Sequence, residues 1–154
     1  MDIDDDPIIS NEYRQTLIEC LPQVWSYNSQ IELSYKHLTF EILNDIILNS
    51  NWQIQLSVIQ SLNLILKKSS TIISSDIISL LESIINLGSR TKSNRLKCEI
   101  LILLKFIFEN SHYSICFHEN EYLRNLLHFN IDEMIYDNRS NDISEQAKQL
   151  KKSN

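Results

Sequence analysis

Residues 29–68 read SQIELSYKHLTFEILNDIILNSNWQIQLSVIQSLNLILKK, and this stretch decides the fold of the chain. It contains two series of large apolar residues that recur at steps of three and four, the spacing that places side chains on one face of an α-helix. The first series is Leu38, Ile42, Leu43, Ile46 and Ile47, and the second is Trp52, Leu56, Ile59, Leu62 and Leu66. A polar run at residues 49–51 separates the two, so we predict an antiparallel hairpin of helices over residues 29–48 and 52–68.

Residues that favour helix N-caps recur with a regular period along the chain. Ser10, Asn51 and Ser93 are spaced by 41 and 42 residues, and a second set, Ser29, Ser75 and Asn120, is spaced by 46 and 45. Serine and asparagine favour this position because their side chains accept hydrogen bonds from the free backbone N–H groups of the first turn. Helix pairs with a period of about 40–47 residues are typical of HEAT and armadillo arrays, so we predict an all-α, HEAT/armadillo-like solenoid of about three helical hairpins.

The flanking segments continue the helical pattern. A first helix over residues 10–25 carries Leu17, Leu21 and Val24 on one face and has no hairpin before it, so we expect this face to fold back on the third helix or to stay partly exposed. The fourth helix begins at Ser75, and Gly88 is expected at its C′ position with a positive φ. Its apolar face is formed by Ile77, Ile78, Leu80, Leu81, Ile84 and Ile85.

Three further helices are expected in the second half of the chain. The fifth spans residues 94–109 and is apolar around much of its circumference, so it requires neighbours on several sides. Its apolar residues are Leu96, Ile100, Leu101, Leu103, Leu104, Ile107 and Phe108. The sixth is indicated by Tyr122, Leu123, Leu126 and Leu127, and a short last helix by Ile143, Ala147 and Leu150. We therefore divide the chain into an acidic, flexible N-terminus (1–9), helical repeats (10–130) and a C-terminal tail with a short helix (131–154).

Composition limits the classes of function. The single glycine among 154 residues cannot build a glycine-rich phosphate-binding loop. The net charge of −6 is opposite to the charge needed for binding nucleic acid, which we do not expect as a partner. The longest apolar run, residues 100–108, contains Lys105 and is too short to span a membrane. Because no secretory signal and no disulfide framework are evident, we expect a cytoplasmic or nuclear protein.

Two groups of residues are candidates for binding a partner or for anchoring the fold. Basic side chains gather at Arg90, Lys92, Arg95 and Lys97, and this cationic cluster is either a partner-binding surface or a solvated turn. Trp52 is either an anchor that fills the gap between stacked repeats or an aromatic contact for a partner. The expected structural anchors are Trp25, Trp52, Leu56, Ile59 and Leu62.

The cysteines and histidines are the residues with potential catalytic or metal-binding chemistry. Cys116 and His118 are two apart, and Cys98 and His112 are near in sequence. A structural zinc site uses four ligands that usually come in short paired spacings, which are missing here. A Cys–His nucleophile needs a third, orienting group, and nothing in the sequence indicates one. We therefore predict no catalytic residue, no cofactor and no metal.

Particular residues resemble a known family. The more specific run lies around Trp52. A segment before it contains Trp25, Asn28, Ser29 and Tyr35, and the tail after it contains Glu145, Lys148, Leu150, Lys151 and Lys152. That run contains Trp52, Gln55, Leu56, Ser57, Val58 and Gln60. Together they resemble the C-terminal end of the large HEAT-repeat proteasome adaptor and scaffold family, over most of the chain from Trp25 onward.

The resemblance implies a non-catalytic scaffold whose partners are proteasome subunits and which links or stabilises the core and regulatory particles. Members of that family are many times longer, so the resemblance also implies either the terminal piece of a scaffold, working with preceding repeats, or a separately encoded relative. Two alternatives remain open. One is a HEAT-type adaptor in transport or cytoskeletal assembly, and the other is a small helical enzyme that uses Cys116 or His118.

The absence of paired ligand spacings predicts that the purified chain holds less than stoichiometric zinc. Elemental analysis after extensive dialysis measures this directly. One zinc ion per chain, with loss of helical circular dichroism on chelation, would contradict the prediction.

Overall fold

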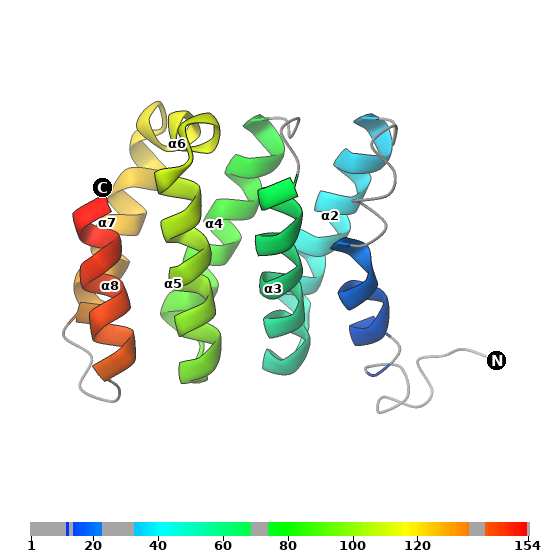
Figure 1. Cartoon of the computed structure of the whole chain (residues 1–154), viewed down its shortest axis with the longest axis horizontal. Coiled ribbons are helices and arrows are strands. Elements are labelled where there is room, and N and C mark those ends of the chain that lie inside the picture. Colours follow the sequence, from blue (N-terminus) through cyan, green and yellow to red (C-terminus); the bar gives the residue numbers. More distant parts are fainter. Residues whose placement is uncertain (1–11, 13, 23–32, 69–73, 136–140, 154) are drawn as a thin grey trace.

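The computed structural model describes residue 12 and residues 14–22, 33–68, 74–135 and 141–153 (Figure 1). These residues form helices joined by short connections, and no strand occurs among them, which confirms the all-α class. Residues 14–22 form a helix that we call the first helix. The helices that follow are α2 (Leu33–Asn49), α3 (Trp52–Lys68), α4 (Ser74–Arg90), α5 (Asn94–Glu109), α6 (Ser111–His118), α7 (Glu121–Ile135) and α8 (Asn141–Ser153).

The helices lie in two rows. The first helix, α3, α5 and α8 form the front row in Figure 1, and α2, α4 and α7 form the back row. Along the front row α3 packs on α5 and α5 on α8, and along the back row α2 packs on α4 and α4 on α7. The rows are joined by contacts within the pairs α2–α3, α4–α5 and α7–α8. Each consecutive pair therefore packs against the next.

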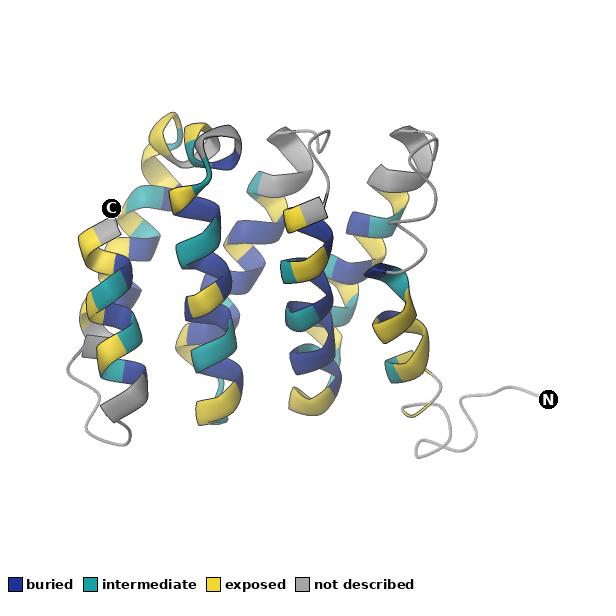
Figure 2. Cartoon of the chain, viewed as in Figure 1, coloured by how far each residue is buried: buried dark blue, intermediate teal, exposed yellow. Residues whose placement is uncertain are grey.

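The predicted apolar faces of α3 and α5 form the centre of the core (Figure 2). Leu56, Ile59, Leu62 and Leu66 of α3 are buried, as predicted. All seven apolar residues predicted for α5 are buried as well. This follows from the position of α5, which has α3 and α8 beside it in its own row and also contacts α4 and α6. A helix surrounded in this way can be apolar around most of its circumference.

Three of the six predicted helix caps are confirmed. The side-chain oxygens of Asn51, Ser93 and Asn120 accept hydrogen bonds from the backbone N–H groups of Ile54 (3.1 Å), Leu96 (3.2 Å) and Leu123 (3.1 Å). Ser10 and Ser29 lie outside the described residues, and α4 begins at Ser74, one residue before the predicted start. Asn110 caps α6 in the same manner (Tyr113 N to Asn110 Oδ1, 3.3 Å), a helix that the sequence analysis missed.

Some predicted positions are wrong. In α2, Leu38 and Ile42 are 48% and 51% exposed, because the face that meets α3 and α4 is formed instead by Phe40, Leu43 and Ile47. Trp52 is 42% exposed, so it is not the buried anchor that was expected. It is the first residue of α3, so no preceding turn of that helix lies beside its ring.

The other corrections concern helix ends. Gly88 is buried inside α4, which continues to Arg90, and no described glycine has a positive φ. A left-handed glycine is not needed there, because carbonyl groups near the end of α4 already have hydrogen-bond donors. The Leu87 carbonyl accepts a hydrogen bond from Thr91 N (2.9 Å), and the Asn86 carbonyl accepts one from Ser89 Oγ (2.9 Å). The domain boundary expected at residue 130 falls within α7, and Tyr122 on that helix is exposed.

Tyr113 links α6 to the end of α3. Its hydroxyl donates a hydrogen bond to the carbonyl of Leu66 (3.0 Å), one of the last carbonyls of α3, which have no partner within the helix. Its ring packs against Phe106 of α5 with 6.4 Å between ring centres, and Lys67 Nζ lies 5.6 Å from the centre of the Phe106 ring. Burial raises the pKa of the Tyr113 phenol above its usual value.

Replacing Leu56 or Ile59 with alanine should each lower the free energy of unfolding by about 2–5 kcal/mol, because each change leaves a cavity in the packed core. Leu64→Ala is the matched control, since Leu64 lies on the same helix and is 47% exposed. Urea unfolding followed by circular dichroism measures the difference. Losses below about 0.5 kcal/mol at both buried positions would place this face of α3 in solvent.

Tyr113→Phe should destabilise the chain by about 1–3 kcal/mol, because the Leu66 carbonyl is left buried without its donor. The control is Tyr122→Phe, which removes an exposed hydroxyl 3.3 Å from Glu82. Because the pKa of the Tyr113 phenol is higher in the folded than in the unfolded chain, the neutral phenol contributes to stability. This contribution is complete below about pH 10, the pKa of an unperturbed tyrosine, and is lost as the pH rises through the pKa of Tyr113 in the folded chain. Equal stability of both variants would contradict this role.

Candidate protein-interaction surfaces

The predicted cationic cluster lies at the turn between α4 and α5. Arg90, Lys92 and Arg95 are exposed there, but Lys97 is only 5% exposed. Lys97 shares a helix face with Leu101, Leu104 and Phe108 at steps of four, three and four, and that face points into the core. The same spacing rule that identified the core of α5 would have removed Lys97 from the surface. The cationic cluster thus consists of Arg90, Lys92 and Arg95.

Local hydrogen bonds fix the turn that carries this cluster. Thr91 Oγ1 accepts from Ser93 N (3.2 Å), and the Ser93 carbonyl accepts from Lys97 N (3.1 Å), which continues the N-cap of α5. At the end of α4, Arg90 Nε donates to the Asn86 carbonyl (3.3 Å). The backbone at Lys92 and Arg95 is therefore held in place relative to both helices, and three basic side chains are presented at one edge of the array.

The remaining predicted residues are distributed as follows. Leu56, Ile59 and Leu62 are buried anchors, Trp52 is partly exposed, and Trp25 lies outside the described residues. Cys20 and His118 are exposed, Cys98 is half-buried, and the side chains of His112 and Cys116 are not described.

Over the described part of the chain, His, Cys, Asp and Glu side chains do not gather in groups of three that could hold a metal ion. Within the same residues, no helix is long and apolar enough to cross a membrane.

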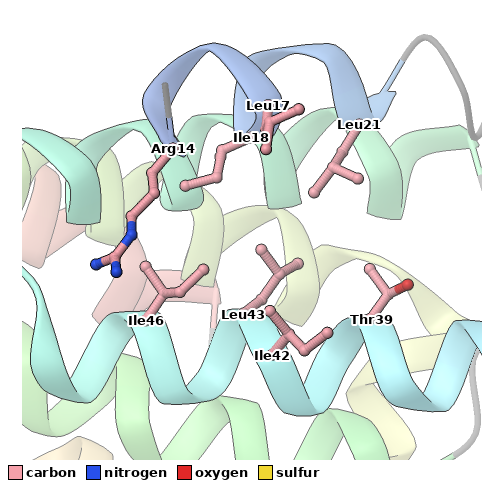
Figure 3. A pocket seen from close by; sticks show the side chains of 8 residues that line it. All are labelled: Arg14, Leu17, Ile18, Leu21, Thr39, Ile42, Leu43 and Ile46. Carbon is pink, nitrogen blue, oxygen red and sulfur yellow. The ribbon is translucent and has the colours of Figure 1, made fainter. Parts of the chain in front are cut away.

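A groove between the first helix and α2 is a feature that the sequence analysis did not identify (Figure 3). It has a volume of about 230 Å³. Six apolar residues line it, Leu17, Ile18 and Leu21 from the first helix and Ile42, Leu43 and Ile46 from α2. The two helices cross the groove antiparallel, with Arg14 near Ile46 at one end and Leu21 near Thr39 at the other (Figure 3).

Of the apolar face expected on the first helix, Leu17 is half exposed, Leu21 is partly buried and Val24 lies outside the described residues, whereas the contact with α3 is made by Ile18. Ile18 is buried, and the Ile18 carbonyl accepts a hydrogen bond from Ser61 Oγ of α3 (2.9 Å), so one side of the helix packs on α3. Leu17, on the side towards the groove, remains 50% exposed. The apolar face of the first helix is the sequence signal for one wall of the groove. The other wall, on α2, includes Ile42 and Ile46, whose spacing is that of core residues.

Comparisons of the chain with protein-family models, with curated proteins and with solved structures find no match.

Proposed function

We propose that this chain is a non-catalytic protein-interaction scaffold with a HEAT/armadillo-like architecture. The observation that supports this most directly is the regular stacking of helix pairs, α2–α3 on α4–α5 and α4–α5 on α7–α8. Such stacking buries the apolar side of each pair against its neighbours and leaves a broad face on each row for partners. Repeat arrays of this kind commonly bind other proteins through these extended surfaces.

We further propose proteasome subunits as the partners, and a role in linking or stabilising the core and regulatory particles. This rests on the resemblance of the segment around Trp52 to the proteasome adaptor family. The cationic cluster of Arg90, Lys92 and Arg95 is the proposed contact, because it is exposed and held by the hydrogen-bonded turn. Basic groups on a surface attract acidic partner surfaces over a range of about 10 Å at 0.1 M salt.

The proposed contact is tested by pull-down with the tagged chain. The double variant Lys92→Glu with Arg95→Glu should capture less proteasome than the wild type at low salt. Capture by the wild type should fall as salt rises, whereas residual capture by the variant should depend on salt only weakly, because the reversed charges no longer attract the partner. The matched control reverses two exposed lysines on α8, Lys148→Glu with Lys152→Glu, which changes the net charge equally.

The outcomes of the pull-down distinguish the proposed contact surface from the proposed partner and from the alternative functions. Equal capture by the wild type and the Lys92/Arg95 variant would remove the cationic cluster from the proposal. Capture of transport or cytoskeletal proteins without any proteasome subunit would favour the other adaptor role. Loss of an enzymatic activity in a folded Cys116→Ala variant would favour a Cys/His enzyme instead.

A further inference from the structure

The surface between α4 and α7 carries the two most exposed large apolar side chains among the described residues, Phe129 at 64% and Tyr122 at 58%. Both lie on α7, seven residues apart, so they project from the same side of the helix and are separated by about 10 Å along its axis. The Tyr122 hydroxyl donates a hydrogen bond to Glu82 Oε1 of α4 (3.3 Å), and α4 is the neighbour of α7 in the back row (Figure 1). We call Glu82, Tyr122 and Phe129 together the α4–α7 surface.

Packing and a hydrogen bond order part of this surface. Leu126 lies between the two rings on the same side of α7 and is partly buried against the core. The hydrogen bond from Tyr122 keeps the Glu82 carboxylate beside the Tyr122 ring. Two of the three side chains are therefore oriented before a partner binds, which lowers the entropy cost of binding.

The charge around this surface is negative. Helices α4 and α7 together carry five carboxylates and two arginines, a net charge of −3. Arg124 lies about 200° around α7 from Tyr122, and Arg90 lies about two turns beyond Glu82 on α4. Among the described residues, Glu82 takes part in no ion pair, and its side chain accepts one hydrogen bond, from Tyr122. Because a carboxylate offers about four acceptor sites, Glu82 can also bind a cation.

An exposed aromatic ring beside such a carboxylate suits an arginine side chain. The face of the ring attracts a cation, and the planar guanidinium group stacks on a ring and forms two parallel hydrogen bonds with a carboxylate, which a lysine ammonium group does not. Phe129, about 10 Å further along α7, offers a contact for an apolar side chain. The net charge of −6 attracts basic proteins and repels nucleic acid.

We propose that the α4–α7 surface binds a basic segment of a partner protein, with an arginine on Tyr122 and Glu82 and an apolar side chain on Phe129. This inference rests on the proposed scaffold function and adds to it a second contact, of opposite charge to the cationic cluster. The scaffold then holds an acidic partner surface at the turn between α4 and α5 and a basic segment on the outer side of the back row.

The test is a titration of the full, nitrogen-15-labelled chain with short peptides, followed by NMR. The peptide consists of glycine and serine apart from one arginine and, three positions later, one leucine, a step that spans about 10 Å in an extended chain. Amide shifts should appear at Glu82, Tyr122 and Phe129. A peptide with glutamine in place of arginine should bind about fivefold more weakly, and one with lysine should also bind more weakly than the arginine peptide.

Two protein variants have matched controls. Glu82→Gln should bind the arginine peptide about fivefold more weakly, whereas Glu145→Gln, which removes an exposed carboxylate on α8, should bind as the wild type does. The double variant Tyr122→Ala with Phe129→Ala should lose the binding, and its control is Leu64→Ala with Ile102→Ala, two exposed apolar residues of α3 and α5. Circular dichroism checks that each variant is folded.

Equal binding of the arginine and glutamine peptides, or equal binding by the wild type and Glu82→Gln, would overturn the inference. Equal binding of the lysine peptide would overturn the assignment to arginine. A wild-type dimer in sedimentation velocity that Glu82→Gln converts to a monomer would assign the surface to a second copy and overturn the proposal. These results are independent of the pull-down, because failure to capture any protein partner counts against the scaffold function and equal peptide binding counts against the α4–α7 surface alone.

Discussion

The packing of α5 between α3 and α8 is the contact on which the rest of the array depends. It contacts α3, α4, α6 and α8, and its eight buried residues are the ones that these neighbours cover. Apolar burial stabilises by about 25 cal/mol per Å², and a helix this apolar would be insoluble without its neighbours. The helix pairs therefore stack because α5 has to be covered on several sides. Because the pairs stack, the outer side of each of the two helix rows remains exposed.

Polar groups determine where the helices end and how the rows are tied together. Asn51, Ser93 and Asn120 satisfy the first-turn N–H groups, and the Tyr113 hydroxyl satisfies a carbonyl near the end of α3. The cap at Ser93 also positions the turn that presents the cationic cluster. The same short turn ends α4, begins α5 and carries the exposed side chains of Arg90, Lys92 and Arg95, because the hydrogen bonds of Arg90, Thr91 and Ser93 fix its backbone between the two helices.

The two ends of the described array differ in chemistry. On α8, the outward residues are polar, including Glu145, Lys148 and Lys152, and Lys151 pairs with Asp132 of α7 at 2.7 Å. Charged side chains such as these are usually found in contact with water. At the other end, the first helix and α2 leave an apolar groove with Leu17 and Ile42 half exposed.

Helix periodicity and N-cap chemistry were enough to predict the all-α class, the bounds of α3 and α5 and three of the caps, because both act within a few residues. The same periodicity contained the information that Lys97 belongs to the buried face of α5, although its charge suggested a surface position. Which side of α2 is buried depends on its tertiary contacts, since Leu38, Ile42, Leu43 and Ile47 all fit a helical stripe and the neighbours of α2 select among them. The groove was likewise beyond the sequence, because its two walls come from separate helices and its volume depends on how far apart they pack.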